Sequence, residues 1–383
     1  MSTKTVPKRT SRAHRNLRRF LRGLGVFTAL FAIAVVVFSF CSQPINLRYS
    51  PTPEALRRPA QVAGVANYAR DEVDTFYTYP EWYIVWSYQA KADFQRNHLP
   101  SGYSYFADIG QFWQAFSRVY GATRRSYPFA TGDHIMLAVI GSSLTVEYSL
   151  KGLYEETVGR VSEWTSRGQM TAEDQYAASV AEHYAAFVHV RPFYEFSFAQ
   201  ALSGLWKDTP FRTAHLPRTL ERRAWLSLDY AVESAYCEVI ELATRATYGI
   251  EDVNTAAWIE FPADAQARLL ASLPSMKIVK DLGAGEAIVE IPRYQEFTSD
   301  AQTLVQNGVH FHQIAGNELI VVSAIAPSGW VSSSNNLQLL LSQPLLTDTD
   351  KTRAVLLGKV SELHEVLPLL KQQGLVIEHL YDY

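Results

Sequence analysis

The sequence predicts a membrane-anchored chain: a single N-terminal transmembrane helix, an all-α helical domain, and a C-terminal α+β domain of ferredoxin-like layout. Three observations predict this fold class. An uncharged apolar run follows a basic head, helical periodicity then dominates, and short strand-like runs appear from residue 286 onward. The expected parts are a cytoplasmic head (1–23), a transmembrane signal anchor (24–41), a linker (42–66), an aromatic-rich helical domain (67–273) and an α+β domain (286–383).

The anchor is predicted from residues 24–40, which carry no charge. At 1.5 Å per residue this run spans about 26 Å, just enough to cross a thin bilayer. A cleaved signal peptide is the alternative, but Phe40 is a poor fit to the small residues that a cleavage site requires. The sequence therefore favours an uncleaved anchor whose partner is the lipid bilayer.

The orientation of the anchor follows from its flanks. Residues 1–23 hold eight Lys or Arg and no Asp or Glu, whereas only Arg48, Arg57 and Arg58 follow the apolar run closely. Because basic flanks stay in the cytoplasm, we expect a single-pass protein of the inner (cytoplasmic) membrane with most of the chain extracytoplasmic. The chain has no Asn-x-Ser/Thr sequon, which favours a bacterial periplasm over a secretory lumen.

The composition of the exported part excludes one class of partner. Residues 24–383 hold 27 Lys and Arg against 38 Asp and Glu, a net charge of −11. A domain this acidic is a poor binder of phosphate backbones, so no nucleic acid is expected. Cys41 lies at the membrane boundary and Cys237 lies within an expected helix, so no disulfide between them is expected. The fold should therefore depend on its apolar core.

The helical domain is predicted from apolar residues that recur every third or fourth position. Pro80 fits the first turn of a helix, and Thr171 with Asp174 resembles a capping box. Pro192 and Pro217 are expected to open two further helices. The expected helices are 80–95, 105–120, 131–167, 171–188, one that begins at 192, 217–248 and 263–273.

The tail is expected to form strands and two helices. Residues 309–314 and 318–326 flank Ala315-Gly316-Asn317 and are predicted to form a β-hairpin. The other expected strands are 286–292, 353–360 and 375–380, and the expected helices are 297–307 and 362–373.

Aromatic residues give the first candidate site. Residues 67–129 contain eighteen Phe, Trp or Tyr. Such a cluster can bind a hydrophobic ligand or a lipid surface, but helix packing and a partner interface explain it as well. The candidate ligand-binding residues are Trp82, Tyr83, Trp86, Tyr105 and Trp113.

Two histidines give a candidate metal site. His310 and His312 are two apart on an expected strand, so both side chains share one face and could chelate one ion, with Glu318 across the hairpin as a third ligand. The alternative is a pair of ordinary histidines on a solvent-facing strand. No cofactor is predicted.

No catalytic motif is present, so whether the chain is an enzyme stays open. The leading hypothesis is a non-catalytic envelope factor that binds a partner protein or a hydrophobic ligand. The alternatives are a metal-binding sensor and an envelope enzyme that uses carboxylates such as Glu147, Glu182 or Glu195. Two buried carboxylates that converge on one cleft would favour the enzyme.

Overall fold

The computed structural model describes Val62, Gly64–Val65, Tyr68–Ala69 and the ranges 78–123, 131–210, 213–247, 254–332 and 336–382. The predicted head (1–23), the anchor (24–41) and most of the linker (42–66) lie outside these residues. Among the described residues, we find no helix with the length and apolar character that crossing a membrane requires.

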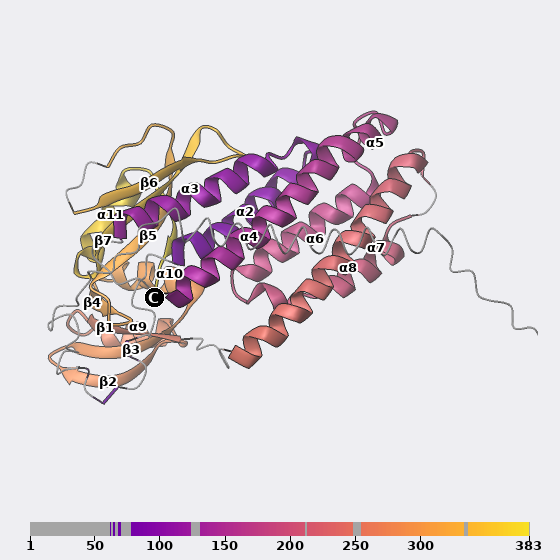
Figure 1. Ribbon diagram of the computed structural model, residues 1–383. Helices are drawn as coiled ribbons and strands as arrows, with labels where there is room; N and C mark the ends of the chain where they lie inside the picture. The colour runs from indigo at the N-terminus through magenta and orange to yellow at the C-terminus, as the bar shows by residue number, and fades with distance from the viewer. Residues whose placement is uncertain are drawn as a thin grey trace, which may run out of the picture.

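The first part of the described chain is a bundle of helices that extends away from the sheets (Figure 1). Short 3-10 turns occur at Pro100–Gly102 and Phe193–Glu195. The helices are α2 (Thr78–Gln95), α3 (Tyr105–Thr123), α4 (Thr131–Tyr154), α5 (Arg160–Thr165), α6 (Ala172–Val188), α7 (Phe198–Asp208) and α8 (Leu216–Thr247).

The ends of these helices follow local sequence signals. The predicted capping box is confirmed, because the Thr171 hydroxyl accepts from the Asp174 backbone and the Asp174 carboxylate accepts from the Thr171 backbone. The expectation that Pro192 opens a helix is wrong. Pro192 precedes only a 3-10 turn, and α7 begins after Ser197, whose hydroxyl caps it.

The helix expected over 131–167 is interrupted by a π-helical turn, Glu155–Gly159, before α5 continues it to Thr165. Such turns carry one extra residue per turn and recur at functional sites.

The sheet region begins earlier than the sequence pattern predicts. Strand β1 (Asn254–Glu260) and helix α9 (Gln266–Ser272) lie inside the range 67–273 that was expected to be helical, but β1 pairs with later strands. The expected boundary at 273 is therefore too late, and the helical region ends with α8. Ala256 and Ala257 obscure the strand, since alanine favours helices in sequence-based expectations.

Two four-stranded antiparallel sheets make up the rest of the chain. The first has the order β2-β3-β1-β4 and the second the order β6-β7-β5-β8. The further elements are β2 (Lys277–Gly283), β3 (Glu286–Pro292), α10 (Tyr294–Gln306), β4 (His310–Ile314), β5 (Leu319–Pro327), β6 (Gln338–Pro344), β7 (Lys351–Lys359), α11 (Leu363–Gln372) and β8 (Val376–Leu380).

The two sheets repeat one topology. In each, the first strand in the chain lies between the third and the fourth, and the second lies at an edge beside the third. Elements β1-α9-β2-β3-α10-β4 follow the βαββαβ order of the ferredoxin-like motif, and β5 to β8 repeat it with α11 as their helix. The expectation of one such unit over 286–383 is therefore wrong in its bounds.

The predicted hairpin is also wrong. β4 pairs with β1, and β5 pairs with β7 and β8, so the two strands belong to different sheets. Only an isolated bridge, Ile314 to Asn317, joins them. The short turn at Ala315-Gly316 ends one unit and starts the next.

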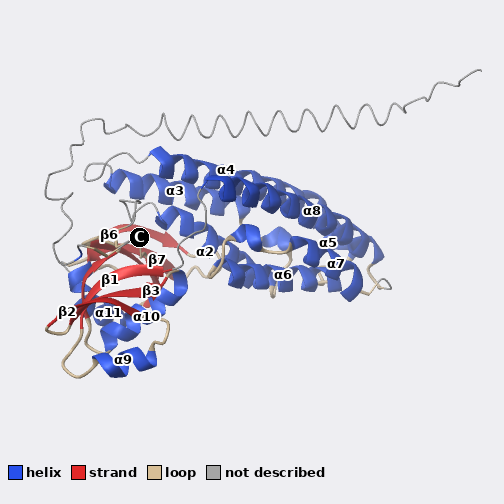
Figure 2. Cartoon of the chain, turned by 90° about the horizontal axis from the view of Figure 1, so that it is seen from below, coloured by secondary structure: helices blue, strands red, loops and turns tan. Residues whose placement is uncertain are grey.

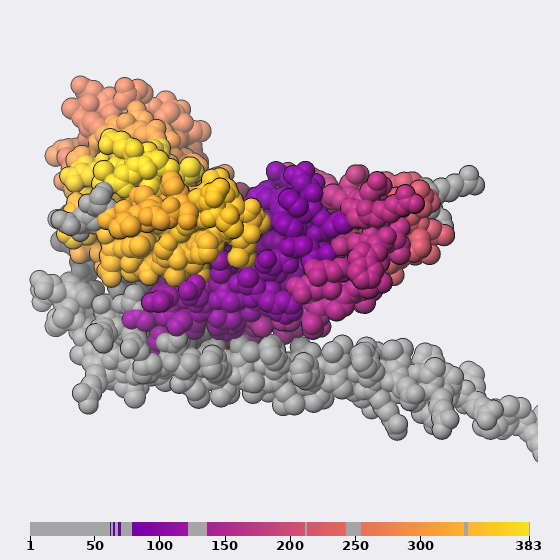
Figure 3. All heavy atoms as spheres, turned by 90° about the horizontal axis from the view of Figure 1, so that it is seen from above, coloured from indigo at the N-terminus to yellow at the C-terminus, as the bar shows by residue number. Residues whose placement is uncertain are grey.

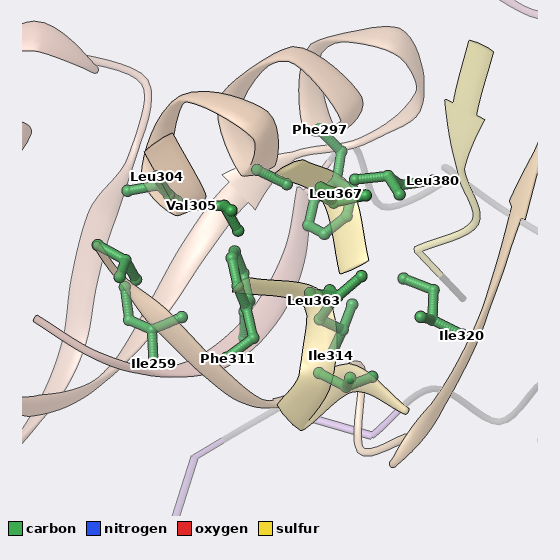
Figure 4. Packing of buried hydrophobic residues seen from close by; sticks show 14 of the residues in the cluster. Ile259, Phe297, Leu304, Val305, Phe311, Ile314, Ile320, Leu363, Leu367 and Leu380 are labelled. Atoms are coloured by element: carbon green, nitrogen blue, oxygen red, sulfur yellow. The ribbon is translucent and has the colours of Figure 1, made fainter. Parts of the chain in front are cut away.

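One apolar core joins both sheets to α9, α10 and α11. Figure 4 shows Phe297 and Val305 of α10 facing Phe311 of β4, with Leu363 of α11 below them. Helices α3 to α8 extend to one side of the molecule, and the strands lie together with α9, α10 and α11 at the other end (Figure 2).

The opposite face of the second sheet packs against the helices. Because side chains alternate along a strand, Val322 points into the shared core while Val321 contacts the aromatic residues of α2 and α3. Figure 3 shows the resulting contact between the sheet region (orange and yellow) and the first helices (violet).

Candidate functional site

The predicted aromatic ligand site is a packed core in the structure. Trp82, Tyr83, Trp86 and Tyr105 are all buried, and Trp82 is 3% exposed. Its ring lies 3.7 Å from that of His379 on β8 and 5.4 Å from that of Trp86. These residues thus join α2 to the second sheet, and Tyr105 also lines a cavity inside the bundle.

Trp113 is half-buried on α3. Its indole nitrogen donates to the Thr145 hydroxyl at 3.0 Å, which ties α3 to α4.

The predicted metal ligands, His310 and His312, do not lie beside a third ligand in the structure. The His310 ring stacks on that of His364 at 4.0 Å, and His312 lies beside Trp258 with Nε2 3.6 Å from Glu260 Oε2. Because the hairpin does not form, Glu318 is not paired across from them. Over the described ranges, no group of three or more His, Cys, Asp or Glu side chains is placed to hold a metal ion.

The three carboxylates considered for catalysis differ in their exposure to solvent. Glu182 is exposed and pairs with Arg96 at 2.7 Å, and Glu195 is exposed as well. Glu147, in contrast, lies inside the bundle and lines a cavity of about 60 Å³ between α2, α4, α6 and α8.

Lys151 organises one side of this cavity. Its ammonium lies 2.8 Å from Glu147 Oε1, 3.1 Å from Asp229 Oδ1 and 2.9 Å from Glu233 Oε1. The ammonium donates hydrogen bonds to Glu147 and Glu233 and forms an ion pair with Asp229. Burial alone would lower the pKa of Lys151, but these carboxylates raise it well above its usual value.

Lys91 of α2 lines the same cavity but has no carboxylate as close as those around Lys151. Its Nζ lies 3.9 Å from Glu147 Oε1, beyond hydrogen-bond range, and above the rings of Tyr88 and Tyr148 at 5.3 and 5.2 Å from their centroids. Burial lowers the pKa of Lys91, and the nearby charge of Lys151 lowers it further.

The carboxylates differ in their protonation. Burial raises the pKa of Glu233 to about 7, and Glu147 and Asp229 add to that rise against the opposing charge of Lys151. For Glu147, burial is outweighed by Lys151 and Lys91, which lower its pKa. A carboxyl group that titrates near neutrality beside a lysine is an arrangement suited to proton transfer.

The far wall of the cavity includes the π-helical turn. Glu155 Oε1 accepts from Arg222 Nη1 at 2.7 Å, while its Oε2 is buried without a hydrogen-bond partner. Burial raises the pKa of Glu155 despite the two arginines nearby.

Three arginines of α8 hold this wall in place. Arg218 and Arg222 both pair with Asp174, at 2.8 and 3.1 Å, and Arg223 pairs with Glu173 at 3.0 Å. All three guanidinium groups are buried, so the N-terminus of α6 is fixed against α8 by paired charges.

Sequence reasoning did not select Lys91 or Lys151, and it considered Asp229 and Glu233 only among the scattered carboxylates of the helical part. A signal was present, since Glu147 and Lys151, and likewise Asp229 and Glu233, lie four residues apart and so share a helix face. Glu147 and Glu233 do converge on one cavity, but their side chains are partly buried, at 17% and 16% exposed.

A second feature lies on the outside of the bundle. Contacts between Ser143 and Tyr236, Lys151 and Asp229, and Tyr154 and Trp225 show that α4 and α8 run antiparallel side by side (Figure 1). Their core-facing sides point the same way, so their outward sides also share one face.

This outward surface, termed the apolar face, has no charged side chain at the positions that define it, and the exposed Glu238 borders it on α8. Its largest side chains are more than half exposed in α8, and Leu242 is 74% exposed. The face consists of Val139, Val146, Leu150 and Leu153 of α4 and Ala224, Leu228, Val232, Ala235, Val239 and Leu242 of α8.

Comparisons of the chain with protein-family models, with curated proteins and with solved structures find no match.

Proposed function

We propose that this chain is a membrane-anchored extracytoplasmic protein that binds an apolar α-helix of a partner protein on the apolar face. The observation that carries the proposal is the uncharged, exposed strip along α4 and α8. On α8 it extends from Ala224 to Leu242, about 27 Å at 1.5 Å per residue. Contiguous exposed apolar surface of this size is typical of interaction sites.

The shape of the face favours a helix as the occupant. Two antiparallel helices side by side present ridges of side chains with a groove between them, and a third helix packs into such a groove. The outward positions of α4 (139, 143, 146, 150 and 153) recur every three or four residues and hold only Val, Ser and Leu. An uncharged helical partner would leave no charge unpaired there.

The charge of the face favours a protein over a lipid surface. Helices that lie on membranes carry Lys and Arg beside their apolar side, and none occurs at the outward positions of α4 or of α8 between Ala224 and Leu242. The exported part is also acidic, with a net charge of −11, which repels anionic headgroups.

The test is site-specific photo-crosslinking of the full chain in its native membrane. Leu228 is replaced by benzoylphenylalanine, and the crosslinked peptides are identified by mass spectrometry. We expect crosslinks to an uncharged, helix-forming segment of one other protein. A second substitution, Val232→Glu, should abolish them, because it places a charge in the groove.

Val376→Glu is the matched control, since Val376 on β8 is 66% exposed, against 57% for Val232, but lies outside the face. This variant should keep the crosslinks. Crosslinks to residues 24–40 of the same chain, to α4 or α8 of a second copy, or to lipid alone would contradict the proposal, as would their absence.

A further inference from the structure

One wall of the bundle cavity carries an ammonium group without a hydrogen-bond acceptor. Lys91 lines the cavity, and its Nζ makes no hydrogen bond to a residue that the structure describes. The nearest carboxylate oxygen, Glu147 Oε1, lies 3.9 Å away and already accepts from Lys151 at 2.8 Å. Because an ammonium has three N–H donors, a molecule inside the cavity must accept hydrogen bonds from Lys91.

Another wall of the cavity carries acceptors without donors. Asp229 and Glu233 line it from α8, and Lys151 contacts only one oxygen of each, Asp229 Oδ1 and Glu233 Oε1. Among the described residues, no hydrogen bond reaches the second oxygen of either carboxylate, and both side chains keep part of their surface accessible. The cavity therefore presents an uncommitted cation from α2 and uncommitted carboxylate oxygens from α8.

This arrangement argues against a simple ion as the ligand. A lone anion bound to Lys91 would lie close to the carboxylates of α8, and a lone cation bound there would lie close to Lys91. A molecule that carries both charges can match each wall. The charged residues of the lining are of both signs, namely Lys91, Lys151, Arg222, Glu147, Glu155, Asp229 and Glu233.

The size of the cavity restricts the ligand further. Its volume is about 60 Å³, and one water requires roughly 10–15 Å³ of such volume, so about four waters or a ligand of about five heavy atoms fit inside. Rings of Tyr88, Tyr184 and Phe198 are part of the lining and leave little space for a larger side chain. Glycine, with an ammonium group, a carboxylate and one methylene group, has the required size and charges.

We propose that the cavity binds a small zwitterionic α-amino acid, glycine or alanine, with its carboxylate on Lys91 and its ammonium on Asp229 and Glu233. The ligand carboxylate accepts the hydrogen bonds that Lys91 lacks, and the ligand ammonium donates to the free oxygens on α8. Lys151 keeps its present contacts. The site lies on the inner side of α4 and α8, so it is separate from the apolar face and goes beyond the binding of a partner helix.

The test is equilibrium dialysis of the full chain in mild detergent against radiolabelled glycine. It is done at pH 8, where Glu233 is ionised because its pKa is about 7. We expect one glycine per chain, and acetate and methylamine should compete about tenfold more weakly or worse, since each lacks one of the two charged contacts. Leucine should also compete poorly, because its side chain exceeds the cavity. The absence of bound glycine, or equal competition by acetate or methylamine, would overturn the proposal.

Two variants locate the ligand within the bundle. Lys91→Met should lower the affinity for glycine about tenfold or more, and Glu233→Gln should lower it because one charge beside the ligand ammonium is lost. Lys371→Met and Glu238→Gln, at exposed positions of α11 and α8, are the matched controls and should bind glycine as the wild type does. Wild-type affinity in either cavity variant would overturn the proposal.

The comparison of ligands on the wild type decides the question even where Lys91→Met does not fold. None of these readouts depends on the apolar face, so a failure of the partner-helix proposal would leave them unchanged.

Discussion

At the scale of single residues, the helical bundle shows how buried charge is tolerated. Lys151, Arg218, Arg222 and Arg223 are each matched to carboxylates within about 3 Å, so their desolvation is offset by paired contacts. The charge of Glu233 is less well matched, because Glu233 shares Lys151 with two other carboxylates. Its proton therefore responds to pH in the neutral range.

The raised pKa of Glu233 predicts a pH-dependent stability. Its carboxyl group keeps its proton up to about pH 7 in the folded chain but releases it near its ordinary value of 4.5 when unfolded. The folded state thus binds the extra proton between these values, and the free energy of unfolding falls as pH rises, by up to about 1.4 kcal/mol per unit. Glu233→Gln should remove this fall, as measured by urea unfolding at pH 5, 6 and 7.

Glu238→Gln provides the comparison, because Glu238 is exposed on the same helix. This variant should follow the wild-type dependence on pH. Parallel curves for the wild type and Glu233→Gln would show that Glu233 does not carry the buried proton.

At the scale of elements, close approach between helices depends on particular small residues. Gly141 of α4 faces α3, and a Cβ added there would lie 2.9 Å from Phe112 Cζ and 3.0 Å from Trp113 Cη2. Both rings are held by further aromatic neighbours, so neither can move away freely. The sequence alone marks Gly141 only as a weak helix residue.

Gly141→Ala should therefore lower the free energy of unfolding by about 1–3 kcal/mol, the usual cost of overpacking. Gly110→Ala on α3 is the matched change, since no atom lies within 4 Å of a Cβ at that position. It should raise the free energy of unfolding by about 0.5–1 kcal/mol through helix propensity. Chemical unfolding of the two variants measures both effects, and a loss of stability in both or in neither would contradict the packing argument.

The π-helical turn is a second feature that depends on contacts between elements. It inserts Glu155 into the bundle, where Arg222 of α8 binds it. Sequence periodicity predicted one long helix through this region, because a single extra residue in one turn leaves little trace in a hydrophobic pattern.

At the scale of the whole molecule, the helical and sheet regions share a core. Trp82 of α2 packs on His379 of β8, Tyr79 donates to Gln343 of β6, and Arg353 of β7 lies over the Trp86 ring. The aromatic residues first considered as a ligand site therefore couple the two halves.

This coupling predicts the effect of Trp82→Ala. We expect the free energy of unfolding to fall by about 3–5 kcal/mol, as for other buried aromatic side chains. The wild type should unfold in one step, with far-UV circular dichroism and tryptophan fluorescence changing together.

Phe106→Ala is a suitable control, because Phe106 is an exposed aromatic residue of the same helical region. Its effect should be much smaller. A ligand-binding role for Trp82 would be supported instead if Trp82→Ala left stability unchanged.

The sequence by itself determined most helix positions in the bundle and the start of α6, because a helix is specified by residues three and four apart and by its own caps. It also predicted an anchor over 24–41 and an acidic exported part, which are properties of composition.

Tertiary structure alone decided the sheets and the site. Strands β4 and β5 are adjacent in sequence, yet each pairs with a strand far away in the chain. Ile314 of β4 pairs with Ala257, and Val322 of β5 pairs with Leu380. The cavity likewise joins Lys91, Glu147 and Glu233 from three helices. Local periodicity carries no information on such partners, since strand pairing and charge pairing depend on which distant surfaces meet when the core closes.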